Sequence, residues 1–105
     1  MATIPQLLAA IPYGKSNAIH AQALAQQLGL LVGGNEVETR QLIREAISQG
    51  HIILSIPVIG YWRSNDRQEV LEYINSLQER ADEIYDRSDA IKNAWNAANP
   101  TNAIP

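Results

Sequence analysis

The sequence predicts a mainly α-helical protein that contains one two-stranded β-hairpin and ends in a long helix. Between Asn35 and Gly50 the apolar residues recur at helical spacing, and the glycine is a typical helix end. Residues 51–56 are apolar and largely β-branched, as a strand requires, and residues 61–63 form the returning strand after a short reversal. From Val70 to Trp95 a heptad spacing continues for nearly four heptads. Together these three observations predict the fold class.

The first helix begins at the N-terminal end of the chain. Thr3 can cap it, Gln6 occupies the reciprocal capping position, and Pro5 lies in the first turn, where its missing N–H costs nothing. Pro12 ends the helix, because the residue before a proline avoids helical angles. Leu7, Leu8 and Ile11 form the apolar stripe of this helix.

A second helix is predicted for residues 18–28. Its cap is either Asn17 or His20, and Gly29 ends it in a left-handed conformation. The residues predicted to face inward are Ile19, Leu24 and Leu28.

The third helix is capped by Asn35, with Glu38 completing the cap reciprocally. One face is apolar and consists of Leu42, Ile43, Ala46 and Ile47. The opposite side carries Val37, Arg40, Gln41, Arg44 and Ser48, so two arginines lie one turn apart on the exposed face.

The hairpin that follows is too short to be stable alone and must pack on the helices. Ile52, Leu54 and Tyr61 are predicted to form its buried face. Its reversal, residues 57–60, contains no lysine or arginine to contact phosphate. Three helices followed by such a hairpin predict a winged helix-turn-helix, in which the third helix is the recognition helix and the hairpin is the wing.

The long C-terminal helix starts near residue 65, with either Asp66 and Glu69 or Asn65 and Gln68 as a capping box, and runs to about Ala98. The domain organisation is therefore a winged helix-turn-helix at residues 1–64, a heptad-patterned helix at 65–98 and a flexible tail at 99–105. The residues of the heptad seam are Val70, Ile74, Leu77, Ala81, Ile84, Ser88, Ile91 and Trp95.

This seam predicts self-association through residues 66–98, because a helix of about 45 Å cannot be covered by a domain of this size. A dimer is the favoured assembly. In a parallel pair, however, Arg87 of one copy faces Lys92 of the other, which favours an antiparallel pair or a larger bundle. The acidic residues of the helix all lie outside the seam.

Charge and composition restrict the possible functions. Residues 1–65 carry a net charge of +1 and residues 66–105 a net charge of −4, so the acidity belongs to the C-terminal element. The chain has no cysteine, which excludes disulfides and thiolate chemistry. No segment is long and apolar enough to span a membrane, and no secretion signal is present, so a cytoplasmic protein is expected. We find no nucleophile–base pair, metal-ligand cluster or phosphate-binding glycine loop, and we expect neither an enzyme nor a bound cofactor, metal or small-molecule substrate.

The motifs "LAQQLG", "RQLIREAISQGHIILS" and "GYW" followed by "EVLEYINSLQERADEI" resemble winged-helix proteins of phage and mobile-element origin. The resemblance covers residues 4–95 and implies binding to double-stranded DNA, by a transcriptional regulator or an accessory replication or mobile-element factor. Arg40, Gln41 and Arg44 match the exposed positions of the recognition helix. The full set of predicted DNA contacts is Lys15, Thr39, Arg40, Gln41, Arg44, Ser48 and Arg63. The alternative is a protein-interaction adaptor in which the winged helix is a scaffold and the long helix binds the partner.

Overall fold

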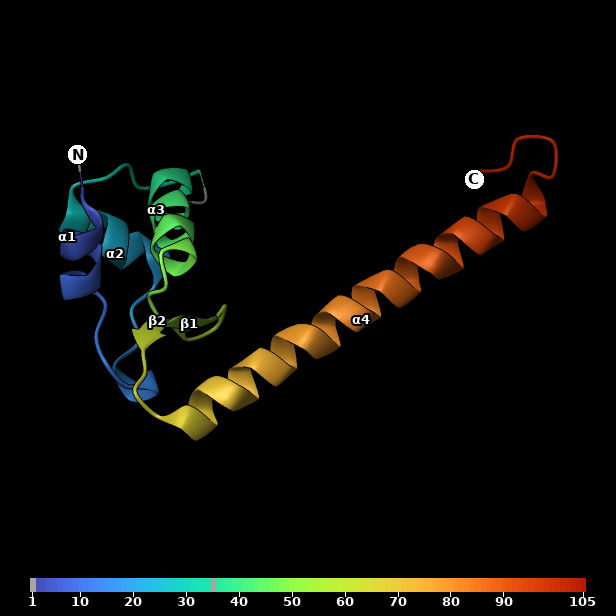
Figure 1. The fold of residues 1–105 in the computed structure, drawn as a ribbon. Helices are drawn as coiled ribbons and strands as arrows, with labels where there is room; N and C mark the ends of the chain where they lie inside the picture. Colours follow the sequence, from blue (N-terminus) through green and yellow to red (C-terminus); the bar gives the residue numbers. More distant parts are fainter. Residues whose placement is uncertain (1, 35) are drawn as a thin grey trace. The chain divides into compact units, whose positions relative to one another are not determined.

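The computed structural model describes residues 2–34 and 36–105, which form four α-helices, one 3₁₀ turn and a two-stranded antiparallel sheet (Figure 1). The elements in chain order are α1 (Ile4–Ala10), the 3₁₀ turn η1 (Lys15–Asn17), α2 (Ala21–Leu28), α3 (Val37–Ser48), β1 (Ile53–Ile56), β2 (Gly60–Arg63) and α4 (Arg67–Ala98). Two compact units divide the chain. The first, here the N-terminal unit, ends at Val70, and the second, the C-terminal unit, is Leu71–Pro105.

The predicted start of α1 is confirmed. The Thr3 hydroxyl accepts from the Gln6 backbone N–H at 3.3 Å, and the Gln6 side chain accepts from the Thr3 N–H at 2.9 Å. These two bonds satisfy N–H groups that a helix start otherwise leaves unpaired. Leu7 and Ile11 then point into the core.

The core of the N-terminal unit lies where α1, α2 and α3 meet β1. Its buried cluster is Leu7, Ile11, Leu24, Ile43, Ala46 and Ile53. Ile19, Leu28 and Tyr61, which were all predicted to face inward, pack against it from the side. Because these are modest aliphatic side chains, α2 and α3 can pack closely on α1.

The second helix begins later than residue 18. Ile19 is extended and forms a bridge with Tyr61, in which each backbone N–H donates to the other residue's carbonyl at 2.9 and 2.7 Å. His20 is the N-cap, although its side chain makes no capping bond, and Gly29 ends the helix in the left-handed conformation, as predicted. Long-range strand pairing therefore overrides the local helical preference of residues 18–20.

Helix α3 has Glu36 as its N-cap residue, and the predicted cap Asn35 lies outside the described residues. The predicted apolar face is partly wrong. Ile43 and Ala46 are buried, but Ile47 is 48% exposed, and the third buried residue of the helix is Thr39. The buried face of α3 is therefore formed by Thr39, Ile43 and Ala46, and Ile47 lies outside it.

The hairpin pairs Ile53 with Arg63 and Leu54 with Trp62. Leu54 is buried as predicted, but Ile52 is 52% exposed, which makes that prediction wrong. Ile52 precedes the first residue of β1, so the alternation of faces does not extend to it. The buried partner of Leu54 on the neighbouring strand is Trp62.

Trp62 also fixes the start of α4. Its indole Nε1 donates to the Glu69 carboxylate at 2.7 Å in a partly buried position. Glu69 therefore binds the indole. The helix is capped by Asp66, whose carboxylate accepts from the Gln68 N–H at 3.0 Å. The helix then continues to Ala98.

We expect Glu69→Leu to lower the free energy of unfolding of the N-terminal unit by roughly 1–3 kcal/mol, because the buried indole N–H loses its charged acceptor. Urea unfolding followed by tryptophan fluorescence measures this loss. Glu79→Leu is the matched control, since Glu79 is exposed on the same helix. Equal losses in the two variants would contradict a role for the Trp62–Glu69 bond.

The segment after Ala98 is bonded back to the end of α4. Trp95 Nε1 donates to the Asn102 carbonyl at 2.9 Å. The Asn96 side chain donates to the Ile104 carbonyl at 3.0 Å and accepts from the Ile104 N–H at 2.7 Å. Residues 99–105, expected to be a flexible tail, thus contact the last turns of the helix.

Candidate nucleic-acid interface

The exposed side of α3 carries most of the predicted DNA contacts. The burial of Ile43 and Ala46 turns Arg40, Gln41, Arg44 and Ser48 outward, and all four are exposed. Thr39 is different. It is 0% exposed, and its hydroxyl has no hydrogen-bond partner among the described residues. The prediction that Thr39 contacts DNA is therefore wrong, because its side chain lies in the core.

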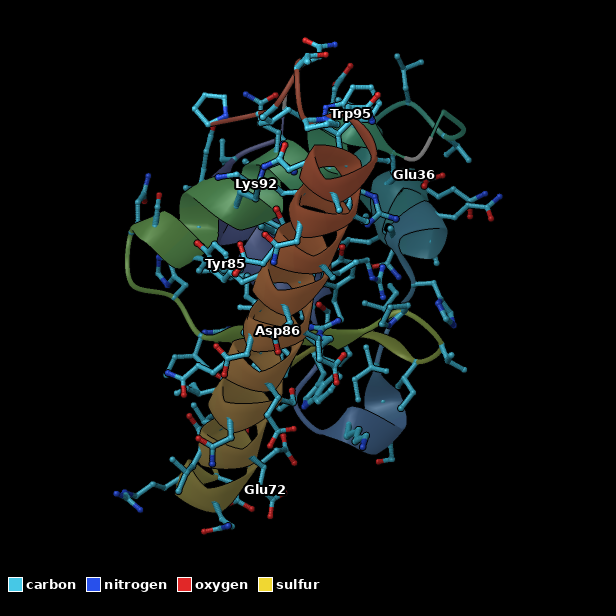
Figure 2. The ribbon with its side chains drawn as sticks, turned by 90° about the vertical axis from the view of Figure 1, so that its right-hand side faces the viewer. Glu36, Glu72, Tyr85, Asp86, Lys92 and Trp95 are labelled. Atoms are coloured by element: carbon cyan, nitrogen blue, oxygen red, sulfur yellow. The ribbon has the colours of Figure 1, made fainter. Side chains whose placement is uncertain are left out.

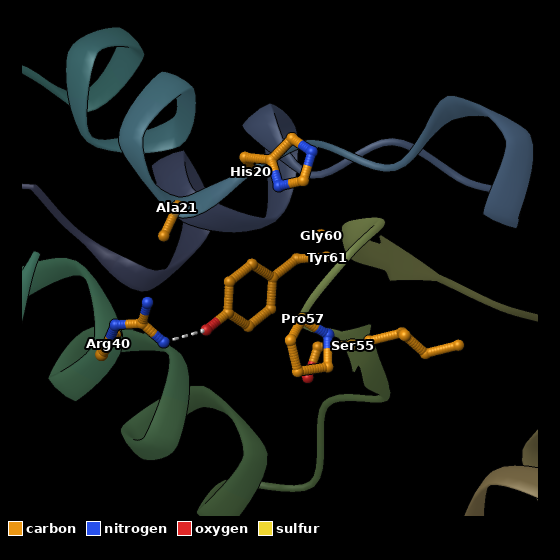
Figure 3. A pocket seen from close by; sticks show the side chains of 8 residues that line it. His20, Ala21, Arg40, Ser55, Pro57, Gly60 and Tyr61 are labelled. Carbon is orange, nitrogen blue, oxygen red and sulfur yellow. Dashed lines mark hydrogen bonds between the residues drawn. The ribbon is translucent and has the colours of Figure 1, made fainter. Parts of the chain in front are cut away.

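Arg40 is held against the hairpin. Its guanidinium Nη1 donates to the Tyr61 hydroxyl at 3.1 Å, which joins α3 to β2 (Figure 3). Since Tyr61 is also paired with Ile19 through its backbone, this one residue connects α3 to the segment before α2. This contact limits the directions in which the Arg40 side chain can extend.

A hollow of about 180 Å³ lies beside this contact. It is lined by His20 and Ala21 at the start of α2, by Arg40 and by residues 55–57, 60 and 61 of the hairpin, of which Ser55 and Tyr61 have polar side chains (Figure 3). The N-terminal end of α2 carries a partial positive charge from its unpaired N–H groups. Arg40 and this helix end therefore both place positive charge beside the hollow.

Gln41 lies on a different flank of α3. It lines a second hollow, of about 350 Å³, together with Glu38, Glu45 and Leu42. The two carboxylates disfavour a polyanion on this flank. The structure therefore separates Gln41 from Arg40, although the two are adjacent in sequence.

Lys15 and Arg63 gather at the end of β2. Arg63 lies over the ring of Tyr13 at 4.7 Å, and Lys15 Nζ lies 6.0 Å from the centre of the Trp62 ring. The backbone holds the two segments together, because Arg63 N–H donates to the Pro12 carbonyl at 2.8 Å and Gly14 N–H donates to the Arg63 carbonyl at 3.0 Å. Both cations are therefore stacked on aromatic rings close to the hairpin.

Reasoning from sequence missed three residues of this surface: Tyr61 as the partner of Arg40, Tyr13 as the platform under Arg63, and His20 at the hollow. The sequence offered one signal for Tyr61, its alternation with Trp62, which places the two on opposite faces of a strand. Tyr13 and His20 are far from their partners along the chain and gave no such signal.

A second candidate surface is the heptad seam on α4. The large seam residues Ile84 and Ile91 are 65% and 64% exposed in the single chain, and Ile74, Leu77 and Trp95 are also exposed. Acidic side chains such as Glu72 and Asp86 and the flanking Tyr85 and Lys92 stand along the same helix (Figure 2). Val70 at the start of the seam is half-buried, and Ala81 and Ser88 are exposed.

Among the described residues, no three His, Asp or Glu side chains come together as a group that could hold a metal ion. Across residues 2–34 and 36–105, no helix has both the length and the apolar character needed to cross a lipid bilayer. A comparison with known protein families, with curated proteins and with solved structures finds no match to this chain.

Proposed function

We propose that this chain is a DNA-binding protein with a winged helix-turn-helix, and that it acts as an oligomer in transcriptional regulation or as an accessory replication or mobile-element factor. The observation that carries the proposal is the order of paired elements in the N-terminal unit: α1, the extended residue Ile19, α2, α3, then β1 and β2. Ile19 pairs with Tyr61 as a third strand does beside a wing. In such an arrangement α3 is the helix that enters the major groove.

Arg40 and Arg44 support this assignment. They lie one turn apart on the exposed side of α3, and a guanidinium can bond both major-groove acceptors of guanine. The Tyr61 hydroxyl restrains Arg40 before binding, so less side-chain entropy is lost on contact with a base. Because Glu38 and Glu45 stand beside Gln41, we place the DNA over the Arg40 and Arg44 flank.

The other two predicted cations, Lys15 and Arg63, fit contacts to the DNA backbone. Lys15 and Arg63 lie by the end of β2, and phosphate contacts supply most of the sequence-independent affinity of DNA-binding proteins. Because the N-terminal unit has few cations, each cation contact supplies a large share of the binding free energy. Binding should therefore be weak for one unit and stronger for an oligomer that presents several.

A titration of a labelled mixed-sequence duplex, followed by fluorescence anisotropy at several low salt concentrations, tests the proposal. Arg44→Ala should weaken binding, because a guanidinium placed against the major groove is lost. Arg67→Ala is the matched control, because it also removes one exposed arginine of the N-terminal unit but lies on α4. We expect its affinity at each salt concentration to equal that of the wild type.

Two results would contradict DNA binding through α3. One is the absence of duplex binding by the wild-type chain at low salt. The other is an equal loss in Arg44→Ala and Arg67→Ala. Tyr61→Phe separates the role of the restraint on Arg40, because it removes only the hydroxyl acceptor and should weaken binding less than Arg40→Ala.

The second candidate function is a protein-interaction adaptor. The tip of the hairpin favours it, since Val58 is 84% exposed and the turn carries no cation. The exposed heptad seam would then be the partner-binding surface. The adaptor requires that the chain fails to bind duplex DNA but retains a partner protein that Ile84→Asp with Ile91→Asp releases.

A further inference from the structure

The exposed apolar face of α4 is broader than the heptad seam alone. On one flank of the seam lie Leu71 and Tyr85, which are 38% and 73% exposed, and on the other lies Tyr73. A two-stranded coiled coil needs only two apolar positions per heptad, whereas a helix with two neighbours needs about three. At these residues the apolar face is therefore wide enough to contact more than one neighbouring helix.

The charges beside the seam also argue against a two-stranded assembly. Its flanking positions carry the cations Arg80, Arg87 and Lys92, and the acids of the helix lie farther out. In a parallel pair of copies Arg87 faces Lys92. In a fully overlapping antiparallel pair Arg80 faces Arg87. A two-stranded assembly of this chain thus sets like charges against each other in both orientations.

A four-helix arrangement brings a carboxylate to these cations, which offsets their repulsion. Each helix then contacts two neighbours, and its contact surface extends past the flanking positions to the next residues around the helix. Glu83 occupies such an outer position. At 1.5 Å per residue, Glu83 of an antiparallel neighbour stands about 3 Å along the axis from Arg80 and about 8 Å from Arg87. One carboxylate then lies between two guanidinium groups.

The sizes of the seam residues set the orientation. In the antiparallel overlap Ala81 meets Ile84 and Ser88 meets Leu77, so each small residue faces a large one. In a parallel assembly Ala81 meets Ala81 and Ser88 meets Ser88, which leaves the layers on both sides of the Ile84 layer underfilled. Cavities in a core cost stability, so the antiparallel order packs better.

We propose that four copies of this chain associate through α4 as an antiparallel four-helix bundle, with Glu83 of each copy between Arg80 and Arg87 of a neighbour. The bundle rests on the self-association included in the proposed function and does not depend on DNA binding. It replaces the dimer favoured from the sequence by a tetramer.

Sedimentation equilibrium or native mass spectrometry of the full chain measures the assembly. Four chains of 11.6 kDa give about 46 kDa, and that mass is expected. A dimer would overturn the bundle and leave self-association intact, whereas a monomer would overturn both. Neither mass depends on the DNA titration, so failure of the bundle and failure of DNA binding are distinguishable.

Charge reversal tests the position of Glu83. We expect Glu83→Arg to weaken tetramer formation at least tenfold, because three cations then meet at one contact. Asp86→Arg makes the same change in charge three residues away, on the outermost face of the helix, and should leave the tetramer unchanged. Combining Glu83→Arg with Arg80→Glu and Arg87→Glu should restore the assembly. Equal effects of the two single variants would overturn the proposal.

The orientation can be tested by cross-linking, because the chain contains no cysteine. A Leu77→Cys chain is mixed with a Ser88→Cys chain and oxidised. Disulfides between the two different chains are expected, since Leu77 and Ser88 share a layer in the antiparallel bundle. Disulfides only between identical chains would show a parallel assembly and overturn the proposed order.

Discussion

Replacing Gly60 by alanine is expected to lower the free energy of unfolding of the N-terminal unit by roughly 2–4 kcal/mol. Gly60 begins β2 with a φ of 109°, a conformation that residues with a Cβ rarely adopt. A Cβ placed there would stand 2.5 Å from the Ile19 carbonyl oxygen, which is backbone and cannot turn aside. The substitution therefore both strains Gly60 and pushes Ile19 away from Tyr61.

Gly50→Ala separates the two causes. Gly50 has a φ of 100°, but a Cβ at Gly50 meets nothing within 4 Å. Gly50→Ala should lower the free energy of unfolding by about 1–2 kcal/mol, which is the cost of the backbone conformation alone. Chemical denaturation of both variants gives the comparison. Equal losses in the two variants would show that the clash between the added Cβ at Gly60 and the Ile19 backbone costs no stability.

The double substitution Ile84→Asp with Ile91→Asp is expected to reduce the assembled chain to a monomer of 11.6 kDa in sedimentation. Both isoleucines are exposed in the single chain, so the change leaves the N-terminal unit folded. In an assembly, each aspartate would bury a carboxylate among apolar side chains, which is strongly unfavourable. The same variant should bind duplex DNA roughly 10²- to 10⁴-fold more weakly, because several units no longer engage one duplex together.

The control for this variant is Asn75→Asp with Asn93→Asp. It adds the same negative charge to the same helix, at exposed positions away from the heptad seam. Its mass and its DNA affinity should stay close to those of the wild type. A control that dissociates as far as the isoleucine variant would show that net charge, and not burial of the seam, governs assembly.

The parts of the fold that local chemistry determines were predictable from the sequence. Thr3, Gln6 and Pro5 define the start of α1 within a few residues, and Gly29 marks the end of α2, because a cap depends only on neighbours in the chain. The start of α2 was not predictable in this way. It depends on the pairing of Ile19 with Tyr61, which lies far along the chain.

The burial of individual residues was harder to predict than the elements. The predicted hairpin face placed Ile52 inside, but β1 begins one residue later, so Ile52 lies before the strand and is exposed, whereas Ile53 and Leu54 are both buried. On α3 the hydroxyl of Thr39 suggested an exposed polar residue, yet the packing of the three helices buries it. Spacing alone does not tell which side of a helix faces its neighbours.

The candidate site was predictable as a set of cations but not as an arrangement. Arg40 and Arg44 are exposed as expected. The bond from Arg40 to Tyr61 and the carboxylates beside Gln41 arise from tertiary packing and from the phase of the helix. The sequence therefore identified the cations of the surface and left open which of them act together.

The pairing of Ile19 with Tyr61 has a consequence for how the N-terminal unit folds. Between these two residues the chain forms α2, α3 and β1, so their bridge closes a long loop. The conformational entropy lost in closing this loop opposes the pairing of Ile19 with the hairpin. Such non-local contacts slow folding relative to a purely local helical bundle. A nascent chain that ends before Tyr61 lacks this closure. The unit should therefore acquire protection of its Ile19 amide from hydrogen exchange only once β2 has been synthesised.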